Sequence, residues 1–191
     1  MSIHEVGIGN LTFELACAVL LSGNNNLFYN NLCYHSMNGV GVTGTSNKVL
    51  SNTFNQMGFS GCNCTAVINL FGSTSAVVQN AIIWDLTATT AISTTGSTTP
   101  TVDHNLTTDP LFVDPTNHIF TLQAGSNAIG TGVDLSSIFT TDYAGLTRTV
   151  PWTIGAYKFV PSGTGLVWRL PASATALRVG AGVTVKLGQT N

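Results

Sequence analysis

The chain has 191 residues, of which 43% are hydrophobic and only 7% are charged, and its net charge at neutral pH is −2. Because ordinary soluble domains contain about 25% charged residues, neutral polar groups must cover this surface, which is typical of β-solenoids and extracellular proteins and unlike a cytosolic enzyme or a helical bundle. The hydrophobic content also excludes a disordered chain, since it supplies enough apolar surface for collapse.

The charges are distributed unevenly along the chain. All eight acidic residues lie at or before Asp142, whereas five of the six basic residues follow it. Two interpretations stay open: a dipolar chain that pairs end to end or docks its basic end on an acidic partner, and a chance fluctuation among few charges. The dispersed basic residues form no dense basic patch, so nucleic acid is not expected as a partner.

The amino-terminal residues predict neither a signal peptide nor a membrane anchor. The apolar run from Leu15 to Leu21 is preceded by Glu5 and Glu14 and by no Lys or Arg, whereas a signal peptide begins with basic residues. No stretch approaches the roughly 20 apolar residues of a membrane span. We therefore expect no membrane contact, and either release by lysis as part of a virus particle or membership of a longer secreted protein.

A repeat of a little over 20 residues is the most informative feature of the sequence. Asn31 in NLFYNNLC matches Asn52 in NKVLSNTF after 21 residues, and a further step of 28 reaches Asn80 in SAVVQNAI. This alignment gives two slots that are apolar in every copy, one holding Phe28, Val49 and Val77 and the other holding Cys33, Phe54 and Ile82. A step of 21 back from Asn31 reaches Asn10, so a first, less regular turn is expected there.

The second half of each repeat also recurs and predicts short strands with one buried face. Val40, Val42 and Gly44 match Ile68, Leu70 and Gly72, and a weaker copy follows at Ile92 and Gly96. The positions between them are polar or small, which favours strands over helices. Since a single such unit cannot bury its apolar face alone, stacking of equivalent strands about 4.8 Å apart is expected. The predicted fold is all-β, a short right-handed parallel β-helix of about four rungs.

The recurring asparagines and the unequal steps have structural explanations. An amide ladder of Asn31, Asn52 and Asn80 is predicted to tie successive corners together, because each side chain can bond to the next turn and tolerates a left-handed backbone. The seven extra residues of the longer step lie within 56–65 (QMGFSGCNCT). This lateral loop is expected either to bind a partner or to fold over the solenoid wall.

The four cysteines, Cys17, Cys33, Cys62 and Cys64, lack the spacing of a structural zinc site. Cys33 falls in an apolar slot of the repeat. A disulfide from the lateral loop to Cys17 or Cys33 stays open, because pairing cannot be deduced from sequence.

The segment from residue 107 onward carries motifs of a known family. DPLFVDP at 109–115, FTLQAGSNAIGTG at 120–132, DYAGLTR at 142–148 and IGAY at 154–157 resemble the carboxy-terminal end of right-handed parallel β-helix proteins of the pectate-lyase-like superfamily, including surface-anchored and phage virion proteins. The resemblance implies that residues 107–160 form a cap that wraps the end of the helix and covers its strand edges, with Asp142 and Arg148 paired inside it. Asn127, Gly130 and Thr153 depart from the family's pattern.

The chain is therefore divided into β-helix rungs at 1–106, a cap at 107–160 and a tail at 161–191. The tail alternates apolar and polar residues between Gly and Pro, which predicts strands, but 30 residues cannot hold a core. It is expected to pack on the β-helix or on a neighbouring subunit, with Trp168 as anchor. The candidate interaction residues in the lateral loop and the tail are Met57, Phe59, Trp168, Arg169, Arg178 and Lys186.

Catalysis is not expected, and neither a cofactor nor a metal is predicted. The acids of the repeat region form no close pair, and the histidines lie near no nucleophile pattern. Tyr34-His35 and Trp84-Asp85 suit either a sugar-stacking strip or packing. The expected function is a non-enzymatic structural protein of the virion surface, a capsid decoration protein or a tail fibre or spike component, which forms a homotrimer and contacts other virion proteins. The alternative is a secreted or cell-surface β-helix that binds or acts on a surface glycan.

Overall fold

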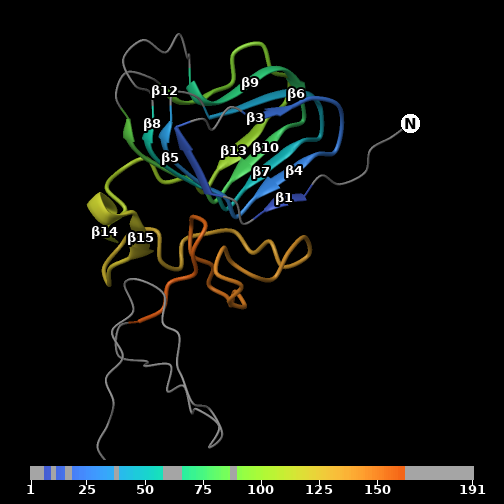
Figure 1. Cartoon of the computed structure of the whole chain (residues 1–191). Helices are drawn as coiled ribbons and strands as arrows, with labels where there is room; N and C mark the ends of the chain where they lie inside the picture. The colour runs from blue at the N-terminus through green and yellow to red at the C-terminus, as the bar shows by residue number, and fades with distance from the viewer. Residues whose placement is uncertain are drawn as a thin grey trace, which may run out of the picture. The chain divides into compact units, whose positions relative to one another are not determined.

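The computed structural model describes residues 7–9, 12–15, 19–36, 39–57, 66–86 and 90–161. Most of the described strands stack in three parallel sheets that surround a common interior (Figure 1). Sheet A has the order β1-β4-β7-β10-β13, sheet B the order β2-β5-β8-β11 and sheet C the order β3-β6-β9-β12. The predicted short parallel β-helix is confirmed.

Each coil of the helix contributes one strand to each sheet. The first coil consists of β1 (Gly7–Gly9), β2 (Thr12–Leu15) and β3 (Val19–Leu21), and the second of β4 (Leu27–Tyr29), β5 (Leu32–Ser36) and β6 (Val40–Thr45). The third consists of β7 (Lys48–Leu50), β8 (Thr53–Met57) and β9 (Ala66–Thr74), and the fourth of β10 (Val77–Gln79), β11 (Ile82–Leu86) and β12 (Thr90–Ser93). β13 (Thr101–Asp103) begins a fifth coil.

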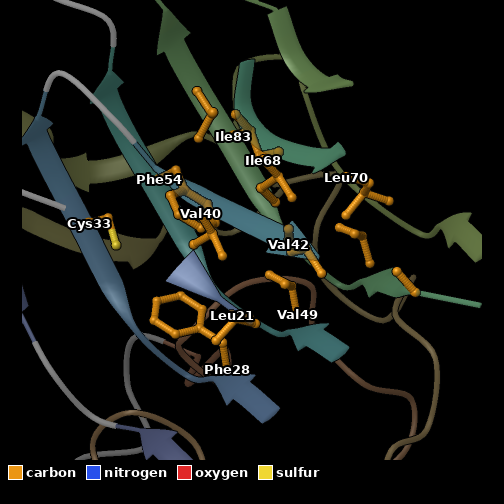
Figure 2. Packing of buried hydrophobic residues seen from close by; sticks show 14 of the residues in the cluster. Leu21, Phe28, Cys33, Val40, Val42, Val49, Phe54, Ile68, Leu70 and Ile83 are labelled. Carbon is orange, nitrogen blue, oxygen red and sulfur yellow. The ribbon is translucent and has the colours of Figure 1, made fainter. Parts of the chain in front are cut away.

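Apolar side chains fill the interior in columns that run from coil to coil (Figure 2). Phe28 pairs with Val49 and Cys33 with Phe54, as the repeat predicted. In the fourth coil the predicted slots are wrong by one residue, because Val49 pairs with Val78 and Phe54 with Ile83. Val77 and Ile82 therefore belong to the outer face, since a slip of one residue turns each side chain to the other side of the sheet.

The slip has a local cause in β9. Val40 pairs with Ile68 and Val42 with Leu70, so the seven-residue insertion between Met57 and Ile68 is confirmed. Gly44, however, pairs with Ser73 rather than with Gly72, because a β-bulge adds one residue after Leu70. The steps from the third to the fourth coil in sheets A and B are then 29 residues instead of the predicted 28. The weaker copy is real, since Ile92 pairs with Ile68 and the Gly72 N–H bonds to the Gly96 carbonyl.

The corners between sheets A and B use left-handed backbone at one equivalent position in the four coils whose corner the structure describes. Asn30, Ser51, Asn80 and His104 occupy this position with φ of 51°, 51°, 57° and 51°. Asparagine and other small or polar residues adopt this conformation more readily than β-branched ones. Asn80 thus aligns with Asn30 and Ser51, and not with Asn31 and Asn52.

The segment after Leu106 packs along the side of the solenoid (Figure 1). It contains β14 (Phe112–Asp114), a 3-10 turn η1 (Pro115–Asn117) and β15 (Ile119–Leu122), followed by irregular chain. On the outer face of sheet B, Leu32, Tyr34 and Ile82 are buried against residues of this segment: Phe112, Phe120, Leu122, Ala128 and Ile154. On sheet A, Leu50 is buried against Leu135 and Trp152. The described contacts therefore place this segment along two outer faces of the helix, where apolar side chains bury it, whereas the resemblance implied a cap over the end.

Arg148 joins this lateral segment to the solenoid. Its guanidinium donates to the Asn30 side chain at 2.9 Å and to the carbonyls of Thr153, Gly155 and Ala156 at 2.8–3.1 Å. It also lies over the ring of Trp152, 5.2 Å from the centroid. Burial lowers the pKa of Arg148 to about 10, against the opposing charge of Asp142, so the side chain stays charged at neutral pH.

The predicted Asp142–Arg148 pair is not formed by direct contact. The buried Asp142 carboxylate instead accepts hydrogen bonds from the backbone N–H groups of Leu146 and Lys158, both at 2.8 Å. Each charged group therefore has hydrogen-bond partners of its own, and the two interact with each other only through space.

Candidate functional site

The asparagine ladder is real in its first step and differs from the prediction in its second. The Asn52 side-chain oxygen accepts from the Asn31 backbone N–H at 2.8 Å and from its side-chain amide at 3.1 Å, and all these groups are buried. The next position along this corner is Ala81, whose N–H donates to the side chain of Asn105 at 2.9 Å. The ladder is thus Asn31, Asn52 and Asn105, with an alanine between the last two, and its role is structural.

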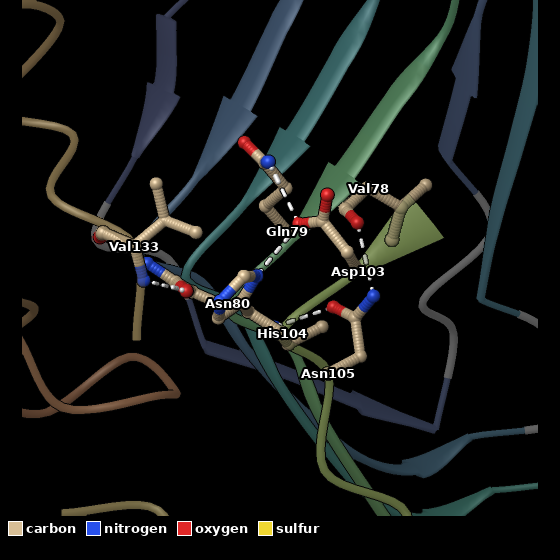
Figure 3. Close-up of polar contacts among 8 residues, drawn as sticks. Val78, Gln79, Asn80, Asp103, His104, Asn105 and Val133 are labelled. Carbon is tan, nitrogen blue, oxygen red and sulfur yellow. Dashed lines mark hydrogen bonds and ion pairs between the residues drawn. The ribbon is translucent and has the colours of Figure 1, made fainter. Parts of the chain in front are cut away.

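Asn80 has a different structural task. Its side chain accepts from the Val133 N–H at 2.8 Å and donates to the Val133 carbonyl at 2.9 Å (Figure 3). Its backbone carbonyl accepts from the Gly155 N–H at 2.8 Å. Asn80 therefore fastens the lateral segment to the solenoid corner.

Of the six candidate interaction residues, Met57 alone falls in the described part of the chain. It ends β8, pairs with Ser36 and Leu86, and is fully buried in the core, so it cannot meet a partner and its assignment to an exposed loop is wrong. Phe59, Trp168, Arg169, Arg178 and Lys186 lie outside the described residues, as do Asn10, Cys17, Cys62 and Cys64. Cys33 is buried in the interior, as its slot predicted.

The suggested sugar-stacking strip is mostly covered. The ring of Tyr34 is buried against His118 and Phe120, with ring centroids 4.4 and 5.3 Å apart. Trp84 packs against the same cluster from β11. Packing is therefore the role of these two rings. At the adjoining corner, His35, Gln56 and Asp85 share one left-handed position in successive coils.

A polar cluster lies at the carboxy-terminal end of sheet A (Figure 3). The same Asp103 carboxylate oxygen accepts from the Gln79 amide at 2.8 Å and meets His104 Nδ1 at 2.9 Å. The hydrogen bond from His104 lowers the pKa of Asp103, and the bond from Gln79 adds to this effect against a contribution from partial burial. In the described chain no hydroxyl or thiol bonds to His104. The cluster orients an imidazole but supplies no attached nucleophile.

Sheet C presents a different kind of surface, because the lateral segment packs on sheets A and B. The outward row of this sheet runs through Leu20, Gly41, Asn69 and Ser93. Leu20 is 58% exposed, and Phe71 at the β9 bulge is 42% exposed. A Cβ placed on Gly41 would lie 3.1 Å from the Phe71 ring and 3.2 Å from Leu20 Cδ1, so both side chains lean over this glycine. We name these three residues the Leu20–Phe71 patch.

The Leu20–Phe71 patch was missed at the level of sequence. Its signal was present: Leu20 lies between two inward residues of an apolar run, and strict alternation places it outside. The bulge that turns Phe71 outward has no comparable signal, because Phe71-Gly72 reads equally well as an ordinary strand end.

The described residues contain no group of three or more His, Cys, Asp or Glu side chains placed to hold a metal ion. In the part of the chain that the structure describes, no helix is long and apolar enough to cross a membrane. Comparison with protein families, with curated proteins and with solved structures found no match to this chain.

Proposed function

We propose that this chain is a non-enzymatic structural subunit of a virion surface, a decoration protein or a component of a tail fibre or spike, which works through contacts with further copies and with other virion proteins. The observation that carries the proposal is the Leu20–Phe71 patch. It places two exposed apolar side chains side by side on the outer face that the lateral segment does not cover.

The chemistry of sheet C supports contact with another protein. The described residues of the sheet C strands β3, β6, β9 and β12 are all uncharged, and those on its outer face include Leu20, Gly41, Thr43, Asn69, Phe71 and Ser93. Association through this face therefore removes no charge from water, a cost that would otherwise oppose binding. Full burial of a Leu or Phe side chain contributes about 1.5–3 kcal/mol. Because Leu20 and Phe71 are 58% and 42% exposed, the two residues together have about that amount left to contribute to a contact.

We infer that the copies form a closed homo-oligomer. Copies that direct the same face toward one axis form a cyclic assembly, and closure at three copies matches the homotrimer expected from the sequence. The motifs at 109–157 and the coil architecture together support a proposed place in the pectate-lyase-like superfamily.

Light scattering after size exclusion tests the contact. At low concentration the wild type should have a mass near three times the chain mass of 19.9 kDa. Under the same conditions the double variant Leu20→Lys/Phe71→Lys should be monomeric, because two ammonium groups would have to be buried. Val150→Lys, on an exposed residue of the lateral segment, is the matched control and should keep the wild-type mass. A monomeric wild type, or a double variant of unchanged mass, would contradict the proposal.

A second candidate function, glycan binding outside the cell, has one observation in its favour. His35, Gln56 and Asp85 form a line of polar side chains along one corner, and such a line can follow the hydroxyl groups of a sugar chain. Binding on a glycan array that is lost in Gln56→Ala would favour this candidate. Equal binding by the variant and the wild type would argue against this corner as the site.

A further inference from the structure

The carboxy-terminal end of the β-helix leaves an interior column uncovered. Phe28, Val49 and Val78 stack in this column and are fully buried. Val102 in β13 continues it, in register with Val78, yet Val102 is 38% exposed. An interior position with no coil above it loses the apolar contact that every inner coil receives.

The backbone at this end is also directed outward. The Thr101 N–H donates back to the Ala76 carbonyl at 2.8 Å. In a parallel ladder, residues that bond to one neighbouring strand alternate with residues that face the opposite side. The N–H and C=O groups of Val102 therefore face away from β10. β12 is likewise the last strand in the order of sheet C.

The lateral segment does not continue the stack over sheet A. Ile82 bridges to Leu106, and the Ile83 N–H bonds to the Leu106 carbonyl, so the chain adds one short step to sheet B. From Phe112 onward its buried apolar side chains pack on the outer faces of sheets A and B. Among the described residues, β12 and β13 are thus the last strands of sheets C and A.

The amino-terminal coil has the complementary edge. β1 and β3 are the first strands of sheets A and C, and each pairs in parallel with the next coil. A second copy placed on top in the same register would set its β1 beside β13 and its β3 beside β12. The backbone of Ile8, which is in register with Phe28, would then lie beside Val102. Val19, which aligns through Val40 and Ile68 with Ile92, would continue the column of Ile92.

We propose that the open end formed by β12 and β13 binds the amino-terminal coil of a second copy, so that the β-helix continues from one subunit into the next. A second copy is the proposed partner, because the open end offers it the same parallel edge and apolar columns that each coil offers the next coil. The contact is heterologous and does not close on itself, so it builds a linear stack. This inference rests on the proposed structural role but uses a surface other than the Leu20–Phe71 patch.

The experiment combines sedimentation velocity with negative-stain electron microscopy of the full chain over a wide range of concentration. The wild type should form end-to-end stacks that lengthen as concentration rises. Val102→Lys should lower the association constant by at least about tenfold, because stacking would bury an ammonium group. Val113→Lys, on an exposed residue of β14 in the lateral segment, is the matched control and should stack like the wild type.

Val102→Pro is a second variant that tests the backbone contact. Proline is tolerated at an edge where the N–H faces outward, but it removes the donor that a stacked copy needs. It should block stacking while leaving the melting temperature of the isolated subunit nearly unchanged. If both Val102 variants stack like the wild type, the inference is wrong.

The outcomes separate this inference from the proposed function. Leu20→Lys/Phe71→Lys should still stack end to end, since the open end is intact. Closed oligomers that never stack would overturn the end-to-end contact and leave the lateral contact standing. A melting temperature lowered by Val102→Lys, with the size of the assembly unchanged, would indicate that the chain's own residues cover this end and would likewise overturn the inference.

Discussion

The change Asn52→Ala tests the corner ladder that holds the coils in register. The Asn52 amide makes four hydrogen bonds in a fully buried site: it accepts two from Asn31, and it donates to the carbonyls of Phe28 and Leu50 at 2.9 and 3.0 Å. Alanine fits the corner sterically, as Ala81 does one coil later, so the variant removes hydrogen bonds without adding a clash.

The expected loss follows from the hydrogen bonds that the variant removes. The Leu50 carbonyl keeps a bond from the Asn30 N–H at 3.2 Å, whereas the buried bonds from the Asn31 backbone N–H and side-chain amide to Asn52 are lost together with their common acceptor. A hydrogen bond contributes about 0.5–1.5 kcal/mol, and removing the partner of a buried group costs about 1–3 kcal/mol, so Asn52→Ala should lower the free energy of unfolding by about 2–5 kcal/mol. That is a large share of the roughly 5–15 kcal/mol of a typical domain.

Urea denaturation followed by tryptophan fluorescence measures the effect, provided that the slope of the transition is unchanged. Asn127→Ala is the matched control, because Asn127 is exposed in the lateral segment, and it should change the unfolding free energy by no more than about 0.5 kcal/mol. A loss below about 1 kcal/mol for Asn52→Ala would refute the assignment of a structural ladder to this corner.

Three further changes test other parts of the structure. Arg148→Met should destabilise the chain by about 3–5 kcal/mol in chemical denaturation, because it removes the donor to the Asn30 side-chain oxygen and to the Thr153 and Gly155 carbonyls, whereas the Ala156 carbonyl keeps the Tyr143 N–H. An effect below about 1 kcal/mol would argue against its joining role. Gly44→Ala should lower the melting temperature by several degrees, because Gly44 has φ of 88° and a Cβ would collide with the Gly23 carbonyl; an unchanged melting temperature would contradict this backbone. Burial raises the pKa of Tyr157 to about 12, above its unfolded value, so its contribution to stability is complete below about pH 10 and is lost as the pH rises toward 12. Tyr157→Phe should flatten the decline of stability over that interval, and identical pH profiles for variant and wild type would exclude this cause.

The sequence allowed the fold to be predicted because stacking repeats the same demand in every coil. An interior position must be apolar and a buried corner amide needs a partner one coil along, so Asn31 and Asn52 reveal a step of 21 residues. The register of the fourth coil could not be deduced from the sequence. The doublets Val77-Val78 and Ile82-Ile83 satisfy either alignment, and Asn80 stands next to Ala81, which occupies the ladder position.

The bulge after Leu70 and the place of the lateral segment required three-dimensional information. No particular residue type marks a bulge in a sequence. Gly72, for example, matches Gly44 in the sequence repeat, although the structure pairs Gly44 with Ser73. The packing of the lateral segment on sheets A and B had a weak signal in the sequence. Leu27, Tyr29 and Leu32 are apolar although they alternate with core residues, which is typical of strands buried on both faces. The candidate surface depends on the same geometry, because the described lateral segment is seen to leave sheet C free only after its packing on sheets A and B is known.

Hydrogen–deuterium exchange of the wild-type chain at low and high concentration tests the central claim most directly, namely that the chain works through two contact surfaces. Amides around Leu20 and Phe71 and the outward amide of Val102 should exchange more slowly at high concentration, because assembly covers them. Amides near the exposed Val150 in the lateral segment should exchange at the same rate at both concentrations. Exchange that is independent of concentration at all these positions, or protection confined to the lateral segment, would contradict the account.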